Sequence, residues 1–409
     1  MELFKRKLYH KIVSQINDKE FVIIAGARQT GKTTILKQLA GYFEDQQIKY
    51  SDLTLEDFSI LTKLNEHPEN IFSFVPKPQK NEKLFVLIDE IQYLKDPTNF
   101  LKLLYDKYSP DLKIIATGSS AFYIDLKFKD SLAGRKQLYE LGTLDFEEFL
   151  LFKTGDNKLE LELNEIRTNS GYISARRREI QGYFTEYLTF GSYPSVVLAS
   201  TAEKKTTILR ELLNSYVKRD ISEANIQYPD KFFYLMQILA EQTGNLLNVN
   251  ELSQTLGLSV TSINAYILIL QKCFHIRLLK PFYRNLRKEL TKMPKIYFSD
   301  SGLRNILLNQ FFQVDQRFDK GALLENYLFL RLTRLYSADN LRYWRTTNQK
   351  EIDFIVLHGL DNGFAIECKF QAVNFDIEQY KQFLEAYPKF PLHCRSYYSE
   401  KNEEWVLAI

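Results

Sequence analysis

The chain has few of the residues on which several classes of protein depend. Its three cysteines are widely spaced, which argues against a disulfide framework and against a zinc site built from cysteine. Sixteen glycines and eleven prolines among 409 residues are too few for a collagen-like or low-complexity chain. Charge is almost balanced, with 54 basic and 51 acidic residues, so no strong overall positive field attracts nucleic acid. Any contact with nucleic acid must therefore come from local patches.

Long apolar segments are also missing. The longest apolar runs, such as residues 21–25 and 265–270, fall far short of the ~20 residues that a spanning helix needs. The N-terminal segment MELFKRKLYH is basic and lacks the apolar stretch of a secretory signal. We therefore expect a cytoplasmic protein that does not enter a membrane.

The pattern of apolar residues divides the chain into four zones, with no convincing internal repeat. Residues 1–150 alternate short β-rich runs (FVIIAG, LFVLIDE and LKIIATG) with helical stretches, which is typical of a parallel sheet covered on both faces. Residues 151–222 favour helices. Residues 223–292 favour three helices followed by a strand, which predicts a winged helix.

The last zone, residues 293–409, predicts an α+β domain with its own core. A helix through Glu325 opens it, and a second helix is expected at 376–387. Strands are expected at 342–345, 351–357 and 364–370, and two further strands close the domain.

A phosphate-binding motif lies at the end of the first β-rich run. Residues 26–33, GARQTGKT, satisfy G-x-x-x-x-G-K-[ST] between a predicted strand and a predicted helix. In this arrangement backbone N–H groups and the helix dipole face phosphate oxygens, Lys32 reaches the β- and γ-phosphates, and the Thr33 hydroxyl coordinates Mg²⁺. We expect nucleotide contacts from Gly26, Ala27, Arg28, Gln29, Thr30, Gly31, Lys32, Thr33 and Thr34.

Two carboxylates form the second half of this site. Asp89 and Glu90 follow the apolar run LFVLI, at the carboxyl edge where open α/β sheets bind ligands. Buried acids at a strand end are costly without a cation, so the pair predicts one. We assign Asp89 to Mg²⁺ and Glu90 to the attacking water as general base.

Two further residues are candidates for catalysis. The third β-rich run leads into Thr117-Gly118-Ser119-Ser120, where the hydroxyl of Ser119 or Thr117 could contact the γ-phosphate or the water. An ordinary polar turn at a strand end is the alternative. Arg135 is a candidate transition-state arginine, supplied in cis or by a neighbouring subunit, and a solvated arginine is its alternative.

The segments GARQTGKTT, LFVLIDEIQYL, IIATGSSAF and LAGR, in this order, resemble the AAA-type ATPases found widely in bacteria and archaea. In that family a P-loop NTPase domain precedes a helical lid, a winged helix and a nuclease-like C-terminal domain. FTEYLTFGSYPSVV, SYVKRDI and KIYFSDSGLRN resemble its middle region, so the likeness covers nearly the whole chain. It implies ATP as the nucleotide with Mg²⁺, and no guanine-specific N-K-x-D sequence opposes this.

A second group of acids lies in the last zone. Glu367 and Lys369 are two apart on a predicted strand and share a face, with Asp353 expected on the neighbouring strand and Glu325 on the preceding helix. Such a set suits metal-dependent phosphodiester hydrolysis, and it resembles the restriction-endonuclease-like fold with its D…E-x-K signature. A binding module with an inactive site is the alternative.

Local basic clusters are the basis for a DNA-binding hypothesis. They are Arg176-Arg177-Arg178 and the group Arg284, Arg287, Lys288, Lys292 and Lys295. A solvated face or a protein-docking winged helix is the alternative. The leading hypothesis is a Mg²⁺-dependent ATPase whose nucleotide state switches its C-terminal domains. The alternatives are an ATP-gated metal-dependent nuclease and a non-catalytic ATP sensor that recruits a protein partner. Homo-oligomerisation is also left open.

Overall fold

The computed structural model describes residues 4–80, 82–118, 132–224, 226–283, 289, 292–346, 348–359 and 362–409. The chain divides into two compact units. The first unit is Met1–Thr143 with Ile269–Phe274, and the second is Leu144–Leu268 with His275–Ile409. The domain boundaries expected near residues 150, 222 and 292 stay predictions.

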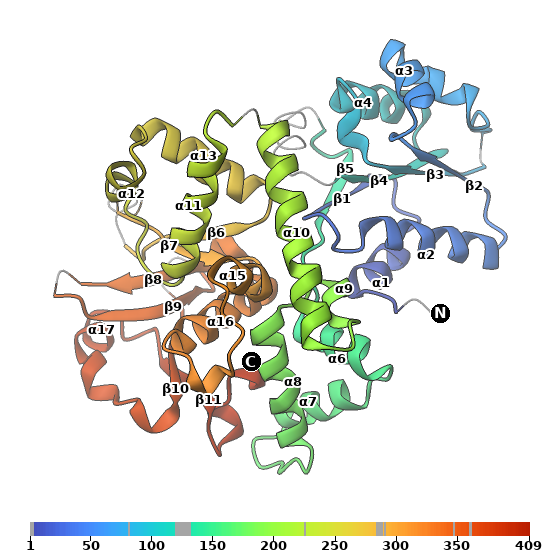
Figure 1. Ribbon diagram of the computed structural model, residues 1–409. Helices are drawn as coiled ribbons and strands as arrows, with labels where there is room; N and C mark the ends of the chain where they lie inside the picture. The colour runs from blue at the N-terminus through green and yellow to red at the C-terminus, as the bar shows by residue number, and fades with distance from the viewer. Residues whose placement is uncertain are drawn as a thin grey trace. The chain divides into compact units, whose positions relative to one another are not determined.

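A five-stranded parallel sheet in the order β2–β3–β4–β1–β5 forms the centre of the first unit (Figure 1). The strands are β1 Phe21–Ala25, β2 Tyr50–Thr54, β3 Leu84–Asp89, β4 Leu112–Gly118 and β5 Lys136–Glu140. The three predicted β-rich runs are the three interior strands. The edge strands β2 and β5 were not predicted, because their side chains are largely half-buried or exposed and leave no apolar run.

Helices cover both faces of this sheet because successive strand residues point to opposite sides. Ile24 of β1 packs with α1 (Lys7–Ser14) and α2 (Lys32–Asp45), whereas Ile23 packs with α3 (Phe58–Glu66) and α4 (Pro97–Tyr108). Figure 1 shows this layered arrangement. All carboxyl strand ends of the parallel sheet share one edge, where the phosphate loop begins.

The second unit opens with helices, as predicted for the central stretch. They are α6 Phe146–Thr154, α7 Lys158–Thr168, α8 Arg177–Phe190, α9 Pro194–Val197, α10 Ala202–Glu223, α11 Pro229–Glu241, α12 Val249–Leu256 and α13 Val260–Lys272, whose last residues from Ile269 on are assigned to the first unit. Gly257, at φ 58°, ends α12 in the left-handed conformation that glycine tolerates best. Strands β6 Ile276–Leu279 and β7 Lys295–Phe298 then pair antiparallel.

The C-terminal part combines two helices with a mixed four-stranded sheet. Helices α15 Ser301–Leu308 and α16 Lys320–Tyr336 precede β8 Leu341–Arg345, β9 Glu351–Leu357 and β10 Gly363–Gln371. A single strand, β11 Leu392–Tyr398, follows α17 Lys381–Ala386 and pairs parallel with β10. The prediction of two closing strands was wrong, because the apolar end of the chain, Trp405–Leu407, packs into the core as short 3₁₀ turns.

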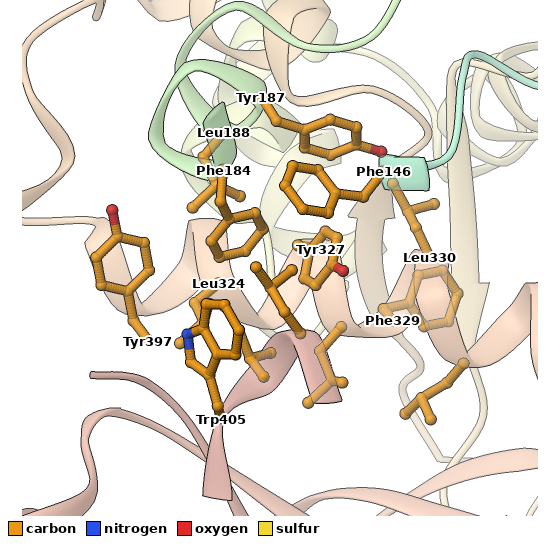
Figure 2. Close-up of a cluster of buried hydrophobic side chains, with 14 of the residues drawn as sticks. Phe146, Phe184, Tyr187, Leu188, Leu324, Tyr327, Phe329, Leu330, Tyr397 and Trp405 are labelled. Carbon is orange, nitrogen blue, oxygen red and sulfur yellow. The ribbon is translucent and has the colours of Figure 1, made fainter. Parts of the chain in front are cut away.

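One large core joins the first helices of the second unit to its C-terminal sheet. Figure 2 shows Phe146 of α6 and Phe184 of α8 beside Tyr327 of α16 and Trp405, and the rings of Phe184 and Tyr327 are 4.6 Å apart. The expectation that the C-terminal domain has its own core was therefore wrong in part. Among the described residues, the opposite sheet face around Ile355 and α17 has a separate small cluster.

Within the described residues, no single helix is long and apolar enough to cross a membrane. The bent pair α12 and α13, with 108° between its helices, passes that test by length and composition alone.

Candidate functional site

The phosphate loop has the backbone conformation that its glycines predict. Gly31 has φ 98°, and a Cβ on Gly26 would lie 2.1 Å from the carbonyl oxygen of Leu141, so neither position accepts a larger residue without strain. Helix α2 begins directly after Gly31 with no side-chain cap. Its first-turn N–H groups therefore point toward the loop, where an anion would satisfy them.

Lys32 is folded back into the loop. Its ammonium donates to the carbonyl oxygens of Gly26 at 3.1 Å and Ala27 at 2.7 Å, and its side chain is 5% exposed. Burial lowers the pKa of Lys32 to about 8, and the nearby acids Glu90 and Asp89 only partly oppose this. A bound polyphosphate would restore the favourable environment of the charge, so the loop fits an anionic ligand.

The residues assigned to Mg²⁺ lie together. The Thr33 hydroxyl donates to Asp89 Oδ2 at 2.8 Å, which joins the start of α2 to the end of β3. A hydroxyl and a carboxylate supply the oxygen ligands that Mg²⁺ prefers. This pair therefore fits the metal that a nucleotide would carry.

The carboxylate of Asp89 and the residue after it also bind Thr117, at the end of β4. The Thr117 hydroxyl donates to Asp89 Oδ1 and accepts the main-chain N–H of Glu90 at 3.2 Å. Thr117 is therefore the hydroxyl that reaches the acids, whereas Ser119 lies outside the described residues.

Glu90 itself is held in an unusual conformation. Its φ of 60° lies in the left-handed region, which is unfavourable by about 1–3 kcal/mol for a residue other than glycine. Residues in such conformations cluster at functional sites. Gln92 donates its side-chain amide to Glu90 Oε2. Gln92 was not predicted, and its only sequence signal is its place two residues after the acid pair.

Arg135 lies away from the phosphate loop, at the amino end of the parallel strands, and its role in cis stays a prediction. Arg135 directly precedes β5, and its carbonyl accepts the N–H of Phe21 at the first residue of β1. The phosphate loop follows the last residue of β1, about 13 Å away along the five-residue strand. The Arg135 guanidinium instead pairs with Asp106 at 2.6 Å. Supply of this arginine by a neighbouring subunit stays a prediction.

The structure brings the predicted C-terminal acids together. Lys369 and Glu367 pair at 2.6 Å on β10, and Asp353 on β9 accepts the N–H of Cys368 at 2.9 Å. Glu325 of α16 completes the group, since burial and the nearby Asp353 carboxylate raise the pKa of Glu325.

An ammonium, however, lies where the metal was expected. Lys295 of β7 is 1% exposed, and its Nζ lies 2.8 Å from Glu325, 2.5 Å from Glu351 and 3.4 Å from Asp353. The described residues contain no group of three or more His, Cys, Asp or Glu side chains that could hold a metal ion. Lys295 thus neutralises two of the predicted acids, Glu325 and Asp353, and the assignment of Glu325, Asp353, Glu367 and Lys369 to a metal stays a prediction.

Charge balance supports this picture of the cluster. Burial alone would lower the pKa of Lys295, but the surrounding carboxylates outweigh it and raise the pKa well above its ordinary value. Arg345 adds a second positive charge, 2.9 Å from Glu351, against three carboxylates. Burial and the nearby Asp353 raise the pKa of Glu325 to about 7, so the charge of the cluster changes close to neutral pH.

The basic clusters give little support to DNA binding. Arg284, Arg287 and Lys288 lie outside the described residues. Lys295 is buried among acids, and so it cannot follow a nucleic-acid backbone. Arg177 donates to Asn402 at 2.6 Å and covers the ring of Trp405, and Arg176 pairs with Glu179 at 2.9 Å. Lys292 and Arg178 are exposed.

Three family models match separate parts of the chain. Residues 18–150 match the AAA domain, residues 181–313 match a domain of unknown function, DUF8612, and residues 320–407 match another, DUF4143. With the parallel sheet and the phosphate loop, the first match defines an AAA-type P-loop domain. Such a domain implies nucleotide binding, typically with Mg²⁺.

Similar proteins occur in distant organisms. An uncharacterised protein of Haemophilus influenzae is 27% identical over 368 residues, which cover 86% of this chain and 84% of that protein. An uncharacterised protein of Methanocaldococcus jannaschii is 29% identical over 336 residues, covering 77% and 69% of the two chains.

Solved structures show weaker likeness. AMPPCP-bound DnaA from Aquifex aeolicus has a TM-score of 0.33 at 14% identity, covering 66% of this chain and 89% of that chain. Domain III of the Thermotoga maritima replication initiation protein DnaA has a TM-score of 0.28 at 18% identity, covering 50% and 90%. Scores this low say nothing about function.

Proposed function

We propose that this protein binds ATP with Mg²⁺ and hydrolyses it, and that the nucleotide state controls the C-terminal part of the chain. The observation that carries this is the contact of Thr33 with Asp89 beside the buried ammonium of Lys32. Lys32 and Thr33 come from the start of α2 and Asp89 from the end of β3, and together they form a polar site for a polyphosphate and its metal.

Each residue of the site has a distinct role. Main-chain N–H groups of residues 26–34 and the Lys32 ammonium bind phosphate oxygens. Thr33 and Asp89 would hold Mg²⁺, which when bound neutralises charge on the phosphates. Glu90 orients and deprotonates the attacking water. The Thr117 hydroxyl holds the Asp89 carboxylate and the main-chain N–H of Glu90 in place.

Substitutions separate binding from hydrolysis. Lys32→Ala should abolish binding of a fluorescent ATP analogue, whereas Glu90→Gln should retain binding and lower phosphate release at least 100-fold. Lys37→Ala, on the exposed face of the same helix, is the matched control and should behave as wild type. Normal hydrolysis by Glu90→Gln would show that Glu90 is not the base.

A second candidate, an ATP sensor that hydrolyses slowly and recruits a protein partner, is favoured by one contact. The Glu90 carboxylate accepts from Gln92, which competes with a water molecule for that oxygen. If the contact restrains Glu90, Gln92→Ala should hydrolyse ATP faster than wild type at equal affinity. A slower Gln92→Ala would instead mean that Gln92 orients the base for catalysis. An ATP-gated nuclease is not proposed, because Lys295 pairs with Glu325 and Asp353, two of the acids that it would need.

A further inference from the structure

A buried arginine outside the predicted site joins the phosphate loop to the end of the first unit. Arg6 directly precedes α1, and its side chain is only 6% exposed. Its Nη1 donates to the carbonyl oxygen of Thr30 at 2.7 Å. Its Nη2 donates to the carbonyl oxygens of Gly142 at 3.0 Å and Thr143 at 3.3 Å. One planar guanidinium therefore connects two backbone segments that are far apart in sequence.

The same two segments also touch at a second place. The N–H of Leu141 donates to Ala25 at 2.7 Å, and the close approach of Leu141 to Gly26 leaves no room for a side chain there. Residues 141–143 thus contact the loop directly at its first residue and through Arg6 at Thr30. A change in the shape of the loop must alter at least one of these contacts.

The segment that carries Arg6 packs on both sides of it against α2, the helix that starts at the loop. Gln38 of α2 donates to the carbonyl oxygen of Phe4 at 3.1 Å, and Tyr9 and Ile12 of α1 pack with the apolar face of α2. The arginine therefore projects from a packed element. A movement of Thr30 is transmitted to residues 142 and 143 instead of being absorbed by a loose side chain.

We propose that Arg6 is a positioning residue that couples nucleotide binding in the phosphate loop to residues 141–143, after which the chain enters the second unit. When the loop turns its N–H groups toward phosphates, the peptide planes rotate and the Thr30 carbonyl moves with them. The guanidinium holds its donors in a fixed fork, so it relays this movement to Gly142 and Thr143. This inference rests on the proposed nucleotide binding, but it does not require hydrolysis.

Hydrogen exchange with a non-hydrolysable ATP analogue and Mg²⁺ tests the coupling. In wild type, the analogue should slow exchange in peptides covering both residues 26–34 and residues 137–146. Arg6→Lys keeps the charge but cannot span three carbonyls. We expect it to bind the analogue about tenfold more weakly. At saturation its loop peptide should be protected as in wild type, while its 137–146 peptide should no longer respond. Lys5→Gln, at the exposed neighbour, should behave as wild type.

The outcomes separate this inference from the proposed function. No protection of the loop peptide in wild type means that nucleotide binding itself fails. If the analogue slows exchange in the loop peptide, and slows it equally in residues 137–146 of wild type and Arg6→Lys, the coupling through Arg6 is refuted while nucleotide binding stands. Exchange in β3 reports whether the variant is folded. If the variant is unfolded, the test uses the wild-type protein alone. The analogue should then slow hydrogen exchange in the peptide covering residues 4–12 as well as in 137–146, and unchanged exchange in either peptide refutes the coupling.

Discussion

Replacing Lys295 by methionine should destabilise the second unit strongly at neutral and alkaline pH. The ammonium lies 2.8 Å from Glu325 and 3.4 Å from Asp353, and it is 1% exposed. Methionine keeps most of the volume of the side chain and removes its charge. Glu351 retains Arg345 at 2.9 Å, so the loss falls mainly on Glu325 and Asp353. Breaking a buried ion pair by removing one partner costs about 3–5 kcal/mol, which is the expected decrease in free energy of unfolding.

The decrease should shrink as the pH falls. The folded-state pKa of Glu325 is already raised to about 7 by burial and Asp353, above its ordinary 4.5. Protonation therefore stabilises the folded state, and this stabilisation is lost as pH rises through the folded pKa. Without Lys295 the pKa of Glu325 rises further, and every tenfold change in an acid dissociation constant corresponds to about 1.4 kcal/mol. The variant should therefore recover part of its stability between pH 8 and pH 5.5.

Urea unfolding followed by tryptophan fluorescence measures this directly. The two tryptophans of the chain, Trp344 and Trp405, both belong to the unit that contains the cluster. Lys350→Met, at an exposed lysine in the same unit, is the matched control and should change stability by no more than about 0.5 kcal/mol. A Lys295→Met protein as stable as wild type at pH 8, or equally destabilised at both pH values, would refute the reasoning.

Three other predictions follow from the same structure. The pKa of Lys32 is about 8 in the protein without nucleotide, and a bound polyphosphate should raise it, so that ATP binding above this pH takes up a proton. Affinity should then fall by up to about tenfold per pH unit above pH 8, and a titration showing constant affinity from pH 7.5 to 9.5 contradicts this. Arg135→Ala should leave single-subunit ATP turnover unchanged, because the side chain pairs with Asp106 at the far edge of the sheet. A loss of turnover that depends on protein concentration would indicate supply in trans. Purified protein should leave plasmid DNA intact with Mg²⁺ or Mn²⁺, since Lys295 occupies the acidic cluster, and cleavage that disappears in Asp353→Ala would show otherwise.

The phosphate loop and the acid pair could be predicted because they are local. GARQTGKT lies between an apolar run and a helical pattern, and LFVLIDE ends in its acids, so each motif carries its own structural context. Strands β2 and β5 escaped prediction because edge strands are half-exposed and show no apolar run. Ser119 could not be compared with Thr117, because it lies outside the described residues.

The amino-acid sequence by itself determined a parallel α/β domain with a nucleotide loop, since short strands, glycines and a lysine at fixed spacing act over a few residues. Tertiary structure alone decided which charges meet. Lys295 is 58 residues from Asp353 in sequence, and Arg6 is 136 residues from Gly142. Which strand end a side chain reaches, and whether a cluster of acids receives a metal or an ammonium, depends on long-range packing. Local periodicity carries no information about such contacts.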